Sequence, residues 1–271
     1  MNLREKKMVD VLKDLKEHHN VIGVKAEFEA EGTRLEDAIR LKEIVMSAGL
    51  NLTIKIGGCE ALRDMYECRV LGVDRVVGPM VESVSAMNKF IAATQLVFPA
   101  DERLDIAFAI NVETVTAVGV FDDMLTSPHI SNLTGIVVGR TDLSRSLNLN
   151  TDQINCQQVF EITKPLFVKA KTAGLVCGCG GGVSAHSLPF FRNLHPGTLD
   201  YFETRKVIFG WNDDPSDKQE HGILKAVGFE LLWLKNKQAY YEAIAKEDQD
   251  RIDVLESRYK HSILEVGGKT E

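Results

Sequence analysis

Strand-like and helix-like patterns alternate along most of this chain, and the alternation limits the folds that it can adopt. Short runs of β-branched and other apolar residues begin near residues 21, 51, 73, 105, 134, 175 and 199. Helical patterns separate these runs, as in α/β proteins with a parallel sheet. We therefore predict a (β/α)8 TIM barrel, with an open doubly wound sheet as the alternative fold.

A TIM barrel needs eight strands, and the sequence shows seven. We expect either that the first strand is cryptic or that an N-terminal helix replaces it. The length of 271 residues fits one barrel with a modest appendage. The predicted organisation is an N-terminal helix over residues 1–20, a barrel over 21–210 and a helical extension over 211–271 that opens with a polar linker. We expect the apolar residues of the extension to pack between subunits of a homo-oligomer.

Composition excludes several classes of protein. The formal net charge of −7 argues against general affinity for nucleic acid. No apolar run reaches the length of a membrane span, and the N-terminus lacks the apolar core of a signal peptide. We therefore expect a cytoplasmic protein with no membrane partner. We expect the five cysteines to be reduced thiols, because most of them are isolated in the sequence. Cys177 and Cys179 have no further ligands nearby that would complete a metal site.

The strand predicted over residues 105–114 has a large apolar face and a small polar one. Ile106, Phe108, Ile110 and Val112 alternate with Ala107, Ala109, Asn111 and Glu113. In a barrel the large residues would face the helices, and the small ones would point inward. This alternation places Asn111 and Glu113 at the mouth of the barrel.

A second strand, within residues 135–147, ends in Gly139, Arg140, Thr141 and Asp142. Asp142 follows Glu113 by 142 − 113 = 29 residues, which suits one β/α repeat between neighbouring strands. Both carboxylates could then reach one cation, and Mg²⁺ or Mn²⁺ is commonly held by one or two carboxylates. The alternative interpretation is that Thr141 or Asp142 caps the next helix.

Charged residues also share one face of three further segments. They are Lys25, Glu27 and Glu29 in the first strand, Lys55 with Thr53 in the second, and Tyr201, Glu203 and Arg205 in the last. For Lys25, Glu27 and Glu29 the pattern indicates either a wall of the active site or a solvated edge of the sheet. Alternatively, Lys25 or Lys55 could form a Schiff base with the carbonyl group of a substrate.

A run of glycines over residues 180–182 ends the strand that begins near residue 175. Ser184 follows as a predicted helix cap. The backbone N–H groups of Gly181 and Gly182 could bind a phosphate or a carboxylate there, or the glycines could simply permit close packing.

Three motifs follow successive strands: residues 78–83 (GPMVES), 111–114 (NVET) and 138–147 (VGRTDLSRSL). Together they resemble signatures of the HpcH/HpaI aldolase and citrate lyase superfamily, and the likeness covers roughly residues 20 to 205. This resemblance implies a TIM barrel of the pyruvate or phosphoenolpyruvate type, in which a divalent metal stabilises an enolate. It also implies that Glu113 and Asp142 are the metal ligands.

The chain departs from the family pattern at four places. Asn111 stands where the family usually has Gln, Lys55 where it has an Arg that holds the keto acid, and Arg140 where aldolases often have Pro. Near the first strand, residues 27–32 (EFEAEG) lack the family histidine that takes part in proton transfer. Glu27, Glu29 or Glu31 is the candidate substitute for that base.

We therefore predict a metal-dependent carbon–carbon lyase that acts on a 2-oxo acid. Lys55 would bind its carboxylate or carbonyl oxygen, and Asn111 would orient the substrate or a water. Arg140 and the glycine run would hold a second anionic group, a phosphate or a carboxylate, unless Arg140 pairs permanently with Glu82 or Glu203. The alternatives are an acyl-CoA lyase of the citrate lyase kind, a phosphoenolpyruvate-handling enzyme, and a degenerate barrel that binds a metabolite.

Overall fold

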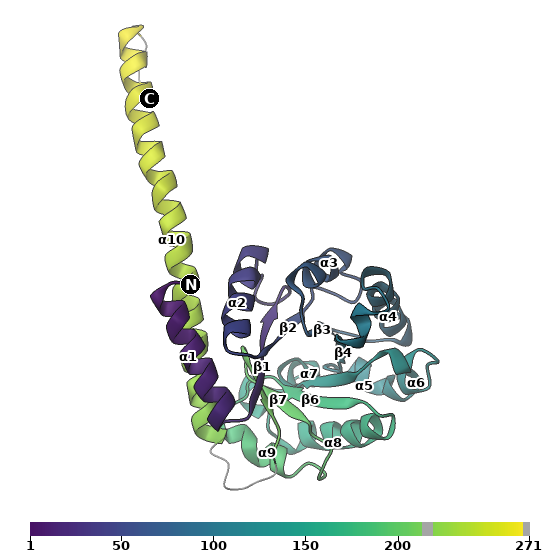
Figure 1. Ribbon diagram of the computed structural model, residues 1–271. Coiled ribbons are helices and arrows are strands. Elements are labelled where there is room, and N and C mark those ends of the chain that lie inside the picture. Colours follow the sequence, from purple (N-terminus) through teal and green to yellow (C-terminus); the bar gives the residue numbers. More distant parts are fainter. Residues whose placement is uncertain (213–218, 268–271) are drawn as a thin grey trace. The chain divides into compact units, whose positions relative to one another are not determined.

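The computed structural model describes residues 1–212 and 219–267, and it contains a closed barrel of eight strands (Figure 1). The strands pair in chain order, and the eighth pairs with the first. The chain divides into two compact units, Met1–Glu230 and Leu231–Glu271. The barrel lies in the first unit, so the predicted fold class is confirmed.

The strands are β1 (Val21–Glu27), β2 (Asn51–Lys55), β3 (Arg75–Gly78), β4 (Ala107–Asn111), β5 (Gly135–Gly139), β6 (Val176–Gly180), β7 (Tyr201–Glu203) and β8 (Val207–Gly210). The α-helices are α1 (Leu3–His18), α2 (Leu35–Ser47), α3 (Leu62–Leu71), α4 (Val84–Val97), α5 (Val115–Gly119), α6 (Phe121–Leu125), α7 (Arg140–Ser146), α8 (Gln157–Thr172), α9 (Leu188–Arg192) and α10 (Gln219–Glu265). Short 3-10 helices are η1 (Glu102–Leu104), η2 (Ile130–Asn132), η3 (Thr151–Gln153) and η4 (Ala185–Ser187).

The strand that the sequence pattern did not reveal is β8. Both interpretations of the missing strand were wrong, because β1 is a regular strand and α1 is an additional helix. Strand β8 follows β7 after only three residues, Thr204, Arg205 and Lys206. So short a connection can join only antiparallel strands, since a parallel pair needs a crossover of a dozen or more residues. Accordingly, β8 is antiparallel to both β7 and β1, whereas the other neighbouring strands are parallel.

Alanine, β-branched side chains and one tyrosine fill part of the interior of the barrel. A buried cluster inside it consists of Val77, Ala109, Val137, Tyr201 and Ile208. The large face of β4 points the other way, because the ring of Phe108 lies 5.4 Å from that of Phe98, the residue after α4. The inward and outward faces predicted for this strand are thus confirmed.

The described part of the C-terminal extension is one long helix, α10, of 47 residues. Most of the polar linker predicted before it, over residues 213–218, lies outside the described residues. The domain boundary predicted at residue 211 stays a prediction. Within residues 1–212 and 219–267, none of the helices combines the length and the apolar character that crossing a bilayer requires.

Candidate active site

Glu113 and Asp142 both lie at the carboxyl ends of two adjacent strands. Strands β4 and β5 are parallel neighbours. Glu113 comes two residues after β4, and Asp142 lies in the first turn of α7, directly after β5. The interpretation of Thr141 or Asp142 as the helix cap is wrong, since the cap position is Gly139. Asp142 is partly exposed and forms an ion pair with Arg145, 3.0 Å from Oδ1 to Nη1.

Glu113 is buried in a tightly fitted pocket of polar groups. Its Oε1 accepts a hydrogen bond from the backbone N–H of Met80 at 3.0 Å, and its Oε2 accepts one from Asn111 Nδ2 at 2.9 Å. A side chain at Gly139 would not fit, because a Cβ there would lie 2.4 Å from Glu113 Oε2. Burial raises the pKa of Glu113, and the nearby charge of Asp142 raises it further, against the lowering effects of Met80 and Asn111.

The donor set fits a hard divalent cation such as Mg²⁺ or Mn²⁺. Beside the two carboxylates, the side-chain oxygen of Asn111 is buried and has no hydrogen-bond partner, an arrangement that a cation or its water would satisfy. In the part of the chain that the structure describes, no group of three or more His, Cys, Asp or Glu residues could hold a metal. A cation here would therefore rest on two carboxylates and neutral oxygens.

The Cys177 and Cys179 pair remains a pair of thiols. Both side chains are buried, and burial raises the pKa of Cys177 to about 12 and that of Cys179 to about 11. Metal ligation requires thiolates, so these residues add nothing to the candidate cation site.

A network of lysines and carboxylates occupies the other side of the barrel mouth. Lys25 Nζ lies 2.5 Å from Glu203 Oε1 and 3.0 Å from Glu27 Oε1, and all three residues are buried. Burial by itself would lower the pKa of Lys25, but the charges of Glu203 and Glu27 outweigh it and raise the pKa. The interpretation of the first strand's charges as a solvated edge is therefore wrong for Lys25 and Glu27.

Lys55, at the end of β2, lies between this network and Glu113. Its Nζ is 2.8 Å from Glu29 Oε2 and 3.5 Å from Glu27 Oε2. Burial would lower the pKa of Lys55, but Glu27, Glu29 and Glu113 together raise it. Because the raised pKa values keep Lys25 and Lys55 protonated at neutral pH, neither is prepared to attack a carbonyl as a Schiff-base lysine must.

The turn between β7 and β8 brings two more cations to the mouth. Arg205, which the sequence predicted as the end of a strand, lies in this turn with its Nη1 3.8 Å from Glu27 Oε2. Lys206 is buried and pairs with Glu31. Sequence reasoning missed Lys206, since strict alternation from Glu203 places Arg205 inside and Lys206 outside. A tight turn breaks this rule.

Arg140 does not lie free to bind a ligand. Its guanidinium is fully buried, and it donates to the carbonyl oxygens of Gly180 at 3.0 Å and Gly181 at 2.9 Å, and to Asn155 Oδ1 at 2.5 Å. The rings of two phenylalanines, at positions 190 and 191, lie 5.0 and 4.8 Å from the guanidinium carbon. The predicted role in binding a second anion is not supported by this geometry. The predicted pairing with Glu82 or Glu203 is also wrong, because no described carboxylate forms an ion pair with Arg140.

The glycine run packs against the start of α7. Gly181 has φ +85°, and a Cβ there would lie 2.5 Å from the backbone nitrogen of Thr141. Gly182 has φ +58°, and its Cβ would lie 2.5 Å from the side chain of Ile154. Of the two interpretations of these glycines, the structure favours close packing over anion binding.

Arg140→Ala is therefore expected to reduce stability and to leave the barrel mouth intact. The change leaves two buried carbonyl groups and Asn155 without their hydrogen-bond donor, which should lower the free energy of unfolding by about 2–4 kcal/mol. Urea unfolding measures that loss, and metal titration of the folded fraction measures the site. A stable variant that has lost affinity for anionic substrates would restore the ligand-binding role.

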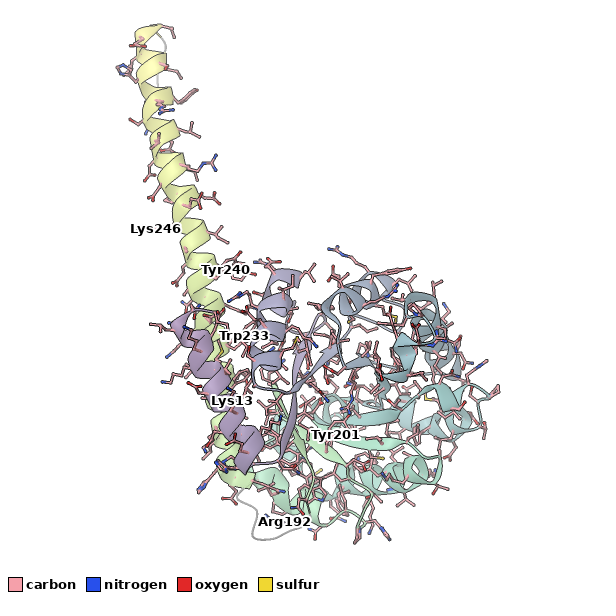
Figure 2. All side chains as sticks on the ribbon, in the orientation of Figure 1. Lys13, Arg192, Tyr201, Trp233, Tyr240 and Lys246 are labelled. Carbon is pink, nitrogen blue, oxygen red and sulfur yellow. The ribbon has the colours of Figure 1, made fainter. Side chains whose placement is uncertain are left out.

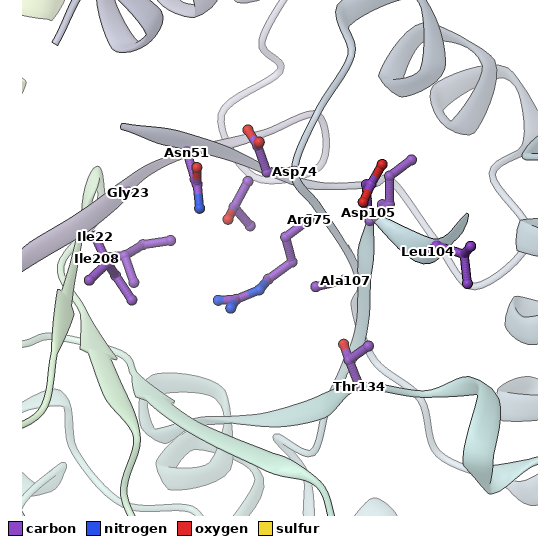
Figure 3. A pocket seen from close by; sticks show the side chains of 12 residues that line it. Ile22, Gly23, Asn51, Asp74, Arg75, Leu104, Asp105, Ala107, Thr134 and Ile208 are labelled. Carbon is purple, nitrogen blue, oxygen red and sulfur yellow. The ribbon is translucent and has the colours of Figure 1, made fainter. Parts of the chain in front are cut away.

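A pocket of about 330 Å³ opens at the opposite end of the barrel (Figure 3). It is lined by Asn51, Arg75 and Ala107, which are the first residues of β2, β3 and β4. The side chain of Arg75 extends into it and stacks on the ring of Tyr201, 4.5 Å from the ring centroid. Thr53 also lines this pocket, but Lys55, Asn111, Glu113 and Asp142 do not, so the carboxyl ends of the strands remain the candidate site.

The class of fold is a closed α/β barrel, with carboxylates at the carboxyl ends of its strands. No family model matches the chain, and no curated protein sequence matches it either. Solved structures, in contrast, match the fold of this chain. A HpcH/HpaI aldolase/citrate lyase family protein from Burkholderia cenocepacia J2315 aligns with a TM-score of 0.59 and 14% identity, over 90% of this chain and 92% of its own.

Two further structures agree with this likeness. A HpcH/HpaI aldolase from Desulfitobacterium hafniense DCB-2 aligns with a TM-score of 0.56 and 16% identity, over 68% of this chain and 77% of its own. The citrate synthase SbnG aligns with a TM-score of 0.58 and 15% identity, over 86% of this chain and 90% of its own. The chain therefore has an aldolase/lyase-type fold, and the resemblance found in the sequence is confirmed in the fold.

Proposed function

We propose that this protein is a metal-dependent carbon–carbon lyase that acts on a 2-oxo acid. The observation that carries the proposal is the arrangement around Glu113, where a buried carboxylate with a raised pKa adjoins Asp142 and the unpartnered oxygen of Asn111. Burying a charged carboxylate without a cation is unfavourable in free energy, and a bound cation would offset that cost. The likeness in fold to HpcH/HpaI aldolase and citrate lyase family proteins supports the same chemistry.

Glu113 and Asp142 would hold the cation, with Asn111 contributing an oxygen or orienting a water. A divalent cation bound there supplies Lewis acidity, which polarises the carbonyl of a 2-oxo acid and stabilises the developing enolate. The requirement for Mg²⁺ or Mn²⁺ is part of the proposal.

Lys55 and Arg205 would bind the substrate carboxylate. Both approach the same oxygen, Glu27 Oε2, at 3.5 and 3.8 Å. The two cations thus converge on one point at the mouth, close to where a 2-oxo acid would lie if its carbonyl faced Glu113. Lys25, Glu27 and Glu203 fix this wall by mutual pairing, and the charge of Glu27 helps to raise the pKa of Lys55.

Glu29 is the carboxylate best placed to move a proton in the absence of the family histidine. Glu27 pairs with Lys25 and Lys55, and Glu31 pairs with Lys206, so both are held in buried ion pairs. The side chain of Glu29 is 36% exposed and contacts only one of these cations, Lys55 at 2.8 Å. It can therefore swing toward a substrate at lower cost than the other two.

One observation favours a second candidate function, a barrel that binds a metabolite without turning it over. Residues 27–32 lack the histidine that takes part in proton transfer in the aldolases that the sequence resembles. A barrel without a working base could bind a 2-oxo acid and leave it intact. Detection of tight 2-oxo acid binding with no exchange or cleavage would favour this function.

Exchange of the methyl protons of pyruvate with D₂O tests the lyase proposal, since it needs the enolate and no acceptor. We expect exchange that depends on Mg²⁺, and we expect Lys55→Met to reduce it roughly a hundredfold while the protein stays folded. Lys89→Met is the matched control, because Lys89 pairs with Glu60 at the exposed surface. Borohydride trapping of pyruvate on Lys55 or Lys25 without metal would overturn the mechanism.

A further inference from the structure

The second compact unit, Leu231–Glu271, carries an apolar surface that the proposed function does not use. Its described part consists of the last 35 residues of α10, Leu231 to Glu265 (265 − 231 + 1 = 35), and the two residues that follow. Large apolar side chains are exposed along it, including Leu255 at 61% and Tyr259 at 66%. Figure 2 shows side chains of this unit, among them Tyr240 and Lys246, standing out from the helix. From residue 242 to residue 262 every residue of this helix is exposed, and a helix so exposed is not expected to be stable by itself with so much apolar surface.

Six of the apolar residues of this helix fit a repeat of seven. In a seven-residue frame Leu231, Leu234, Tyr241, Ile252, Leu255 and Tyr259 lie on one stripe, which we name the α10 seam. In heptad notation Leu231, Ile252 and Tyr259 occupy a positions, and Leu234, Tyr241 and Leu255 occupy d positions. Alternating a and d residues are the signature of a coiled coil.

The first turns of α10 show which side of the helix packs in the first compact unit and which side stays open to a partner. Ala226 and Phe229, in the first compact unit, are fully buried. In the same heptad frame they occupy c and f positions, on the side opposite to a and d. The seam is therefore not the side by which α10 begins its packing.

Charges beside the seam identify the partner and its direction. From residue 237 to residue 263 the charged g positions are Lys237, Arg251 and Arg258, and the charged e positions are Glu242 and Glu256. In a parallel pair each g residue faces the e residue five positions later on the other chain. Lys237 then faces the partner's Glu242, and Arg251 faces the partner's Glu256, with no like-charged pair. An antiparallel pair would bring basic g positions together.

We propose that the α10 seam binds a second copy of this chain in a parallel two-stranded coiled coil. The apolar stripe, its exposure, and the opposite charges at g and e each support this arrangement. Gln238 at an a position lies opposite its own copy, where paired side-chain amides fix the register. Asp248 at a d position weakens the dimer, because the two carboxylates meet at the seam. The proposal stands independently of the enzymatic one.

Light scattering of the full chain at tens of micromolar tests the proposal, and we expect the mass of a dimer. Ile252→Asp should weaken the dimer by roughly a hundredfold or more, because it places a charge in the seam. Val254→Asp is the matched control, since Val254 is 51% exposed on the same helix but lies at a c position. A monomeric wild-type chain, or equal loss in the two variants, would overturn the proposal.

Charge exchange tests the direction of the two helices. Arg251→Glu and Glu256→Arg should each weaken the dimer, and the double variant should recover it, because the pair is restored between chains. The two residues are five apart and do not face each other on one helix. Asp248→Leu should strengthen the dimer. Failure of the double variant to recover would contradict the parallel arrangement.

Discussion

Asp142→Ala is expected to abolish stabilisation of the protein by Mn²⁺. Asp142 supplies one of only two carboxylates at the candidate cation site, and the neutral oxygen of Asn111 cannot replace its charge. At about 1,000 times its dissociation constant, a bound cation stabilises the folded state by about 4 kcal/mol. The variant should lose this entire increment in thermal unfolding with and without the metal.

Arg145→Ala provides the matched control for this prediction. Arg145 pairs with Asp142 but is not itself a proposed ligand. Its removal frees Asp142 from a competing cation, so the affinity for Mn²⁺ should stay constant or rise. Unchanged affinity in Asp142→Ala, measured by calorimetry, would show that the cation site is placed wrongly.

The pH dependence of the same stabilisation follows from Glu113. The cation binds the charged carboxylate, and burial raises the pKa of Glu113. Metal affinity should therefore begin to fall at a higher pH than for an exposed glutamate. Without metal the sign is opposite, because the stability contributed by a carboxyl group with a raised pKa is present at low pH and is lost as the pH rises through that pKa. Thermal unfolding with and without Mn²⁺, from about pH 5 to pH 8, measures both effects.

Lys25→Met is expected to be among the most destabilising single changes in the barrel. The variant leaves Glu203 and Glu27 buried next to each other without the cation that lies 2.5 and 3.0 Å from them. Breaking a buried ion pair by removing one partner typically costs about 3–5 kcal/mol. Urea unfolding of the metal-free protein should show a loss of this size.

Two further variants separate charge burial from simple loss of packing. Lys25→Met combined with Glu203→Gln removes one charge of each sign and should recover much of the loss. Lys225→Met should cost less than about 1 kcal/mol, because Lys225 pairs with Asp14 at the exposed surface. If Lys25→Met were as mild as Lys225→Met, the network at the barrel mouth would not be a buried one.

Local sequence patterns were sufficient for the framework and for one part of the site. The two-residue period of residues 105–114 predicted which side chains of β4 face inward, because successive side chains of a strand point to opposite faces. The spacing of Glu113 and Asp142 predicted that they end adjacent strands, because one β/α repeat has a nearly constant length. Both inferences depend on backbone geometry that every strand shares.

Features set by turns and by packing between distant segments were decided only by the tertiary structure. The prediction relied on helical patterns between strands, and no helix precedes β8, because a three-residue turn after β7 reverses the direction of the chain. That turn brings Lys206 to Glu31, although 175 residues separate them in the sequence. The sequence pattern predicted only that Arg140 is a cation at the end of a strand. Its actual partners, the carbonyl groups of Gly180 and Gly181, come from the next strand and its loop. A sequence pattern reports the spacing of side chains along one segment, whereas burial and pairing depend on which segments the fold brings together.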